Sequence, residues 1–217
     1  MARNKHPEET VEKILSVSRR LFAERGYEHT TIADIVAATG MSKGAFYHHF
    51  KSKEDVYDRI TDQYYESKDW MRDATKFPGR NALEKMQGLF GFLLSDPAKL
   101  DLDKMSVSIK LNPRLVLLAL ESTVRDAAPV VEVLIREGNA DGSLHVAQPR
   151  ETAEAFMLLM NMWVGVFIGD RADFTAKIVF LKSMTDSLGL PILNQELIDV
   201  AMRYYDDIMA CLPAPSL

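Results

Sequence analysis

Residues 30–53 read TTIADIVAATGMSKGAFYHHFKSK, and this stretch predicts two short helices joined by a tight turn. Thr31 and Asp34 have the spacing of a capping box, in which two side chains satisfy free backbone N–H groups at a helix start. Gly40 suits the left-handed conformation that ends a helix, and Ser42 is a good N-cap for the next one. The pattern predicts a helix-turn-helix, an arrangement by which proteins read DNA.

The second of these helices is expected to bury one face and to present the other to DNA. Phe46 and Phe50 are four residues apart and should point inward together. On the outward face, small residues allow approach to the major groove, while cations and neutral donors bind phosphates. The predicted DNA-binding residues are Thr31, Ser42, Lys43, Gly44, Ala45, Tyr47, His48 and Lys53.

Gly44 stands inside the predicted recognition helix, where glycine costs about 1 kcal/mol relative to alanine. Close approach to the DNA backbone is one explanation for its presence, and an exposed glycine in a short, weak helix is the other. Ser52 is expected to cap a further helix, whose free N–H groups would also attract a phosphate.

A helix is predicted over residues 7–25, before the helix-turn-helix. Pro7 fits its first turn and Gly26 fits its end. Its apolar stripe is expected to pack on the two following helices, in a core that includes Leu21, Phe22, Ile35, Phe46 and Phe50.

The run LFAERGYEHTTIADIV over residues 21–36, followed by GMSKGAFYHHFKSKE over residues 40–54, resembles the N-terminal signature of TetR/AcrR-type transcriptional regulators. The resemblance implies an all-α homodimer with a DNA-binding head on each subunit and a larger C-terminal domain for ligand and partner. It also implies a small-molecule effector whose binding changes the head spacing and releases a palindromic operator in double-stranded DNA.

The whole chain is predicted to be all-α, with a DNA-binding domain over residues 1–53 and an effector-binding and dimerisation domain over residues 54–217. A long helix from Ser52 to Ala74 is expected to join the two. Proline and glycine breaks then delimit helices at 81–95, 101–111, 114–137 with a kink at Pro129, 150–168, 173–188 and 194–211.

Charge is distributed unevenly along the 217 residues, whose formal net charge is −5. Residues 1–53 contain nine Lys and Arg against six Asp and Glu, a balance of +3, so the remainder carries −8. The asymmetry favours a basic nucleic-acid-binding head on an acidic domain.

The segment at 150–168 is apolar on most of its circumference, which predicts burial on every side. A partner subunit on one side and a pocket on the other would satisfy this, so we expect a homodimer. The resemblance to TetR-type regulators implies that this helix and one or both of the last two form a four-helix bundle across the dimer. A monomer with a buried core is the alternative.

An effector pocket is expected in the C-terminal domain, with apolar walls and a few polar anchors. The candidate residues are Phe90, Met105, Leu118, Glu121, Arg125, Met160, Asn161, Trp163 and Phe167. The same residues fit a plain apolar core and a surface ion pair, so a DNA-binding regulator without an effector, either a constitutive repressor or an activator, is the second hypothesis.

Enzymatic activity is not expected, because the sequence has no glycine-rich phosphate loop and no His-Glu-x-x-His pair. No cofactor and no metal are predicted, since adjacent His48 and His49 diverge on a helix. A single cysteine, Cys211, and the absence of an apolar leader or of a run of about 20 apolar residues favour a cytoplasmic protein that does not enter membranes.

Overall fold

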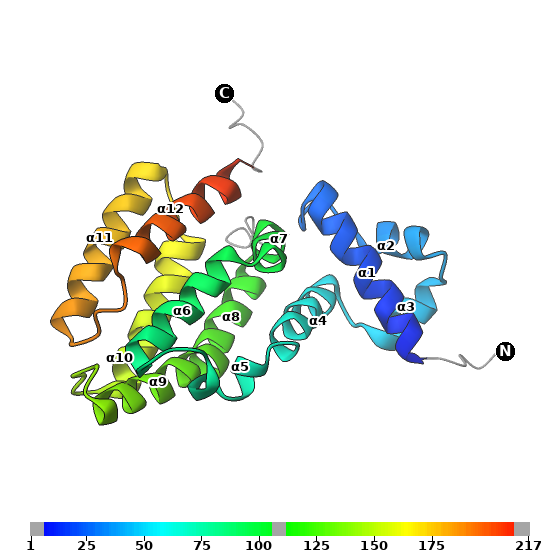
Figure 1. Ribbon diagram of the computed structural model, residues 1–217. Coiled ribbons are helices and arrows are strands. Elements are labelled where there is room, and N and C mark those ends of the chain that lie inside the picture. Colours follow the sequence, from blue (N-terminus) through cyan, green and yellow to red (C-terminus); the bar gives the residue numbers. More distant parts are fainter. Residues whose placement is uncertain (1–6, 106–111, 211–217) are drawn as a thin grey trace. The chain divides into compact units, whose positions relative to one another are not determined.

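The computed structural model describes residues 7–105 and 112–210, and every regular element in these ranges is helical, as predicted (Figure 1). The chain divides into two compact units. We call the first the head, with described residues 7–67 and 101–105, and the second the body, with residues 68–100 and 112–210. The head contains α1 (Pro7–Arg25), α2 (Ile32–Thr39), α3 (Lys43–His49), α4 (Lys53–Glu66) and the end of α7 (Pro97–Met105).

The predicted caps of the helix-turn-helix are confirmed. The Thr31 hydroxyl accepts from the Asp34 N–H at 3.1 Å, and the Asp34 carboxylate accepts from the Thr31 N–H at 2.8 Å. These hydrogen bonds from Thr31 hold the pKa of Asp34 below its usual value. Gly40 ends α2 in the left-handed region with a φ of 68°, and the Ser42 hydroxyl caps α3 by accepting from the Ala45 N–H at 3.1 Å.

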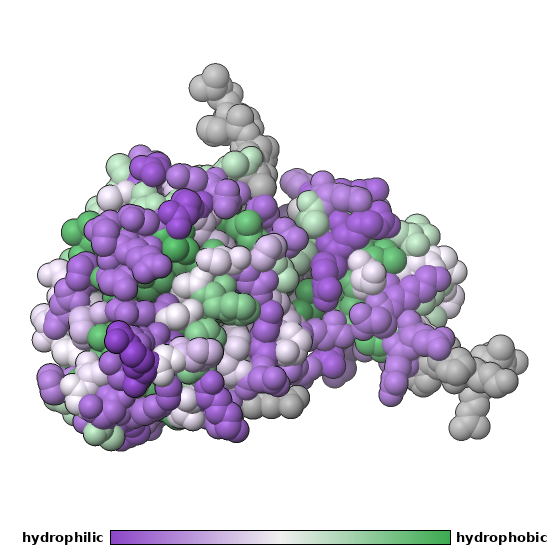
Figure 2. Space-filling view, in the orientation of Figure 1, coloured by the Kyte–Doolittle hydropathy of each residue, from purple (hydrophilic) through white to green (hydrophobic). Residues whose placement is uncertain are grey.

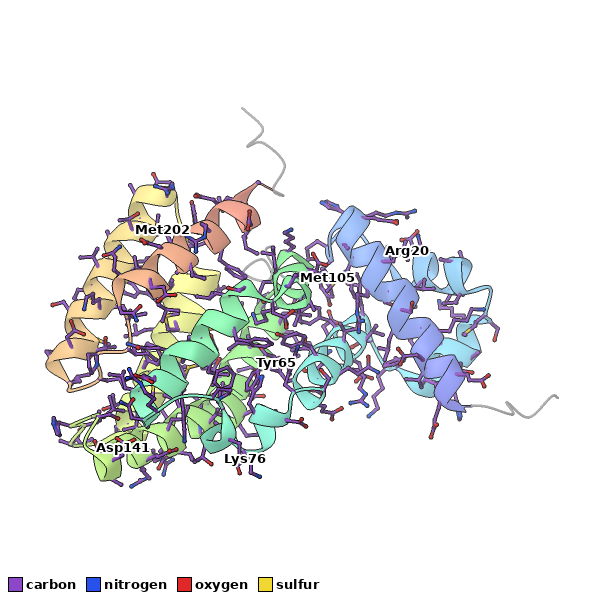
Figure 3. All side chains as sticks on the ribbon, in the orientation of Figure 1. Arg20, Tyr65, Lys76, Met105, Asp141 and Met202 are labelled. Carbon is purple, nitrogen blue, oxygen red and sulfur yellow. The ribbon has the colours of Figure 1, made fainter. Side chains whose placement is uncertain are left out.

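The core of the head is formed by one face of α1 against α2, α3 and α4. Its predicted members are all buried, and the core also takes in residues of α4. In contrast, Arg20 on α1 extends away from this core into solvent (Figure 3). The buried apolar side chains include Ile14, Leu15, Leu21, Phe22, Ile35, Phe46, Phe50, Val56 and Ile60.

The predicted long helix from Ser52 to Ala74 is interrupted. α4 ends at Glu66, and the chain forms a new short helix, α5 (Asp69–Arg72). The break occurs at Lys68, which is extended with φ −103° and ψ 116° and whose ammonium pairs with the Asp96 carboxylate at 2.8 Å. α4 packs on α1, so the compact head unit runs to residue 67. That the DNA-binding domain itself ends at residue 53 stays a prediction.

The body is an array of helices around one apolar core. α9 packs against both α6 and α10, and α12 packs against α6 (Figure 1). On α12, Met202 faces α11, where its sulfur accepts from the Thr175 hydroxyl at 3.8 Å (Figure 3). The described elements of the body are α5, η1 (Ala74–Lys76), α6 (Ala82–Ser95), the start of α7, α8 (Pro113–Ser122), η3 (Thr123–Ala127), α9 (Ala128–Asp141), α10 (Pro149–Leu158), η4 (Leu159–Val166), α11 (Arg171–Ser187) and α12 (Gln195–Met209).

Several predicted ends are confirmed, including the stop of α6 before Pro97 and the Asn194 cap of α12. α7 begins earlier than predicted, at Pro97 instead of residue 101, because the Asp96 side chain accepts from the Ala98 N–H at 2.9 Å and starts a new turn. The predicted continuation over 106–111 lies outside the described residues. Among the described helices, none is both long and apolar enough to cross a membrane.

The kink predicted at Pro129 takes the form of a π-helical segment. Instead of one helix over 114–137, α8 passes into η3 and then into α9. Proline has no N–H to give to the carbonyl four residues before it, so the α-helical ladder fails at this point. The ladder shifts register just before it, because the Ala128 N–H donates to the Thr123 carbonyl five residues back.

A second π-helical segment, η4, interrupts the predicted helix over 150–168 and ends where the Phe167 N–H donates to the Met162 carbonyl at 2.8 Å. The two π-helical segments are joined by a hydrogen bond, from the Asn161 amide to the buried Thr123 hydroxyl at 3.0 Å. The Thr123 hydroxyl in turn donates to the Ala119 carbonyl at 2.7 Å. Each irregular segment is therefore held by a polar contact as well as by packing.

We expect Thr123→Val to lower the free energy of unfolding of the body by about 1–2 kcal/mol, because it leaves the Asn161 amide unpaired in a nearly isosteric site. Urea unfolding followed by tryptophan fluorescence measures this, since both tryptophans, Trp70 and Trp163, lie in the body. Thr175→Val, at an exposed position of α11, is the matched control. Equal losses of unfolding free energy in the two variants would show that the hydrogen bond between Asn161 and Thr123 contributes nothing to stability.

Candidate nucleic-acid interface

The seven residues of α3 separate into a buried and an exposed face, as predicted. Phe46 is 1% exposed, and its ring centroid lies 6.0 Å from that of the buried Phe50. Tyr47 is 46% exposed, and Gly44 and His48 lie on the exposed side as well. The buried phenylalanines therefore fix which side chains of α3 reach an approaching molecule.

A groove of about 660 Å³ runs between α2 and α3. It brings together Thr31, Lys43 and Tyr47, three residues predicted to contact DNA. The Lys43 ammonium lies 6.0 Å from the centre of the Tyr47 ring, so the cation and the phenol occupy the same wall. Both are solvent-exposed, and neither is committed to the core of the head.

The apolar part of this groove was not predicted as part of the site. Of the apolar residues Ile32, Ile35 and Val36 of α2, only Ile35 is fully buried, and the other two line the groove with Ala33, Ala37 and Met41. Hydrophobic atoms are exposed on the head where Figure 1 draws α2 (Figure 2). The sequence feature that could have indicated this groove is the pair Ala33 and Ala37, four residues apart, whose small side chains leave the outer side of α2 flat.

Gly44 is not required by packing within the head. A Cβ atom added at this position would meet only the Ser42 hydroxyl oxygen, at 3.9 Å. Its backbone is helical, without the positive φ that favours glycine. The absence of a side chain at this position therefore has no explanation in the contacts described for the head.

The other predicted DNA-binding residues of the helix-turn-helix differ in how far contacts within the head already occupy or bury their side chains. The Ser42 hydroxyl is used in capping, and Ala45 is half-buried. The His48 ring lies on the exposed side with its centroid 5.0 Å from that of His49.

Lys53 has a fixed position in the structure. It is the first residue of α4, where the Ser52 hydroxyl accepts from the Asp55 N–H at 3.1 Å. Its ammonium donates to the Tyr27 carbonyl at 2.7 Å and lies 4.0 Å from the centre of the Tyr27 ring. Desolvation lowers the pKa of Lys53, and the nearby carboxylates of Glu28 and Glu54 oppose this effect.

The candidate effector residues of the body do not gather around one described cavity. Phe90 is in the core, with its ring 5.5 Å from that of Phe156, and Met160 packs against the same core. Asn161 is hydrogen-bonded to Thr123, as described above. Met105 is buried in the head unit and is not a member of the core cluster of the body.

The remaining candidates lie nearer the surface of the body. Arg125 pairs with Asp126 at 2.8 Å instead of with Glu121, which is exposed. A groove of about 550 Å³ includes Arg125 but none of the other candidates. Trp163 packs edge-on against Phe180, and the half-buried Leu118 and the exposed Phe167 complete the set.

No group of three or more His, Cys, Asp or Glu side chains in the described ranges 7–105 and 112–210 is arranged to hold a metal ion. The candidate functional site is therefore the exposed face of α3 together with the groove beside it.

Known proteins resemble the head most closely. Residues 14–60 match the family described as "Bacterial regulatory proteins, tetR family". The HTH-type transcriptional repressor KstR2 of Mycobacterium tuberculosis is 38% identical over 82 residues, which cover 36% of this chain and 39% of that protein. The HTH-type transcriptional repressor AcnR of Corynebacterium glutamicum is 34% identical over 109 residues, covering 50% and 52%. The chain thus spans about half the length, or less, of these curated relatives.

The likeness in fold extends further along the chain. The structure of Salmonella enterica GusR matches with a TM-score of 0.61 at 22% identity, covering 87% of this chain and 99% of that one. At this identity the match concerns the fold alone. The head, with its capped helix-turn-helix and its sequence signature, thus matches the TetR-type regulators over residues 14–60, and beyond the head the likeness is one of fold.

Proposed function

We propose that this protein is a sequence-specific transcriptional repressor that binds double-stranded DNA as a homodimer. The observation that carries the proposal is the exposed face of α3, where Lys43, Gly44 and Tyr47 stand opposite the buried phenylalanines. Two such helices would enter successive major grooves of a palindromic operator, with half-sites about 34–36 Å apart.

The residues of the interface divide by chemistry into two groups. Lys43, Tyr47, His48 and Lys53 supply cations and neutral donors for phosphates. Ser42, Gly44 and Ala45 are small and let α3 approach the base edges, while Thr31 stands at the N-terminus of α2, where free N–H groups favour an anion. Both groups belong to a protein without enzymatic activity.

The dimer would form through an apolar surface of the body. η4 packs against both α8 and α11, and exposed apolar side chains lie on α8, on α11 and at Phe167, which directly follows η4. Phe180 on α11 is 56% exposed and rests edge-on against Trp163, while Val179 beside it is 60% exposed. Figure 2 shows hydrophobic atoms at the surface where Figure 1 draws α11. A second copy of the chain would remove this surface from water.

Release of the operator by a small apolar or aromatic effector is the finer part of the proposal. The second candidate, a regulator without an effector, is favoured by one observation: of the three predicted polar anchors, Asn161, Glu121 and Arg125, the first and the last already have partners within the body. A screen for compounds that release the bound operator separates the two. If an effector bound the Trp163→Ala variant as tightly as it binds the unaltered protein, Trp163 would not be part of the pocket wall.

Selection of bound duplexes from random DNA, followed by titration of the selected duplex at two salt concentrations, tests the proposed function. We expect a palindromic sequence and an affinity that falls steeply with salt, because phosphate contacts release counterions. Folded protein that enriches no duplex would contradict DNA binding.

Gly44→Ala is expected to raise the stability of the head while weakening DNA binding. The new methyl group has open space in the free protein, so the helix gains about 0.5–1 kcal/mol. Against a closely approaching DNA strand the same methyl group would cost about 1–3 kcal/mol, or roughly fivefold to more than a hundredfold in affinity. Urea unfolding and operator titration give the two values.

Gly91→Ala in α6 of the body is the matched control, because its added Cβ would meet only Leu197, at an ordinary 4.0 Å. It should leave DNA affinity unchanged. If Gly44→Ala bound the operator as tightly as the control, close approach at Gly44 would be refuted.

Lys53→Ala is expected to weaken binding to all duplexes by a similar factor and to reduce the salt slope by about 1. The measurement is operator affinity against the logarithm of salt concentration, with Lys182→Ala, an exposed lysine of the body, as control. If the salt slope of Lys53→Ala equalled that of the control, Lys53 would not be one of the phosphate contacts.

Phe180→Glu is expected to convert the protein from a dimer to a monomer, because it places a charge in the apolar surface of α11. Light scattering should then give the chain mass of 24.5 kDa instead of twice that mass. Val133→Glu, at a 47% exposed position of α9, is the control that should stay dimeric. A monomeric unaltered protein at micromolar concentration would contradict the dimer itself.

A further inference from the structure

Lys53 is held by Tyr27 through two different contacts. The ammonium donates to the Tyr27 main-chain carbonyl at 2.7 Å, and the same nitrogen lies 4.0 Å from the centre of the Tyr27 ring. The second distance is well inside the range in which the negative face of an aromatic ring attracts a cation. One residue thus fixes the end of a side chain that begins 26 positions further along the sequence.

The Tyr27 ring is itself immobilised. Tyr27 is 1% exposed, and its ring centroid lies 5.1 Å from that of Phe22 and 5.5 Å from that of Tyr57. The hydroxyl is also buried, and this burial, together with the neighbouring Glu54 carboxylate, raises its pKa well above the usual value. Tyr27 therefore offers Lys53 a rigid support that does not carry charge of its own.

Holding a lysine in this way matters for binding. A free lysine side chain loses up to about 2 kcal/mol of rotamer entropy when a contact fixes it. The Tyr27 contacts have already fixed Lys53 in the free protein, so a phosphate would not have to supply that ordering. The ammonium has three N–H donors, and the Tyr27 carbonyl takes only one of them.

Position adds to this effect. Lys53 is the first residue of α4, at the positive end of the helix, and its side chain is only partly buried. Lys43, in contrast, is exposed, and its nitrogen is 6.0 Å from the nearest described ring, that of Tyr47. The two cations of the proposed interface thus differ in how far they are ordered before DNA arrives.

We propose that Tyr27 is a positioning residue for DNA binding: its ring and carbonyl hold the Lys53 ammonium in place, with its remaining N–H groups free for a backbone phosphate. The inference rests on the proposed DNA-binding function and deepens it. Tyr27 touches no DNA in this arrangement and acts only through Lys53.

The test exploits the electrostatic nature of the ring contact. Tyr27→Phe keeps the ring and the carbonyl. Phenylalanines with one, two and three ring fluorines at position 27 then lower the negative electrostatic potential of the ring face stepwise, with little change in size. Operator affinity is measured for each protein, once with Lys53 present and once with Lys53→Met. Because the ring remains, the head should fold in every member of the series, which far-UV circular dichroism checks.

With Lys53 present, we expect Tyr27→Phe to bind like the unaltered protein and affinity to fall stepwise with fluorination, by about threefold to tenfold over the series. The salt slope should stay constant, because the ammonium is still there. In the Lys53→Met background, fluorination should have no effect on affinity. A purely structural role for Tyr27 would give the same response in both backgrounds, and that result overturns the proposal.

The outcomes separate this inference from the function on which it rests. Unaltered, folded protein that binds no duplex overturns both. Protein that binds its operator with an affinity independent of fluorination overturns only the role of Tyr27 and leaves DNA binding by α3 intact.

Discussion

The burial of Phe46 and Phe50 is the constraint on which the interface of the head depends. A helix of seven residues is too short to be stable in water by itself, since isolated helices need about 12–15 residues. α3 therefore exists because Phe46 within it and Phe50 at its C-cap enter the core of the head. Their positions also fix the rotation of the helix: a turn of 100° about its axis would expose a phenylalanine and bury Tyr47 or Lys43. The exposed face, which we propose binds DNA, is thus a consequence of the face that is buried.

Much of this could be predicted, because it rests on contacts between near neighbours in the sequence. The Thr31 and Ser42 caps span three residues, and the left-handed Gly40 requires only the absence of a side chain. Such rules work without knowledge of the rest of the fold. Contacts between distant residues have no such local pattern. Nothing near Lys53 in the sequence indicates that its ammonium will lie on Tyr27, so the lysine could be placed in the site while its support could not.

The body shows the same division. The prolines and caps predicted where helices stop, because a missing N–H or a capping oxygen acts locally. They did not predict the π-helical segments η3 and η4, whose polar joint connects Thr123 with Asn161, 38 positions away. Residue type alone also does not identify an effector pocket. Methionine and aromatic side chains serve equally well as core, and Phe90 is used in that way, packed against Phe156.

Two kinds of cation in one small interface have a mechanical consequence for the proposed repressor. A lysine held in place, such as Lys53, binds with little loss of entropy but tolerates only a narrow range of phosphate positions. An exposed lysine, such as Lys43, costs more to order and can follow a backbone that shifts with sequence. The fixed lysine stands on α4, which the core of the head holds through Val56 and Ile60. The adaptable one stands on the helix that would enter the groove. In the proposed complex the rigid contact would therefore set the register of the head on the DNA backbone, and the adaptable contact would leave α3 free to fit the bases.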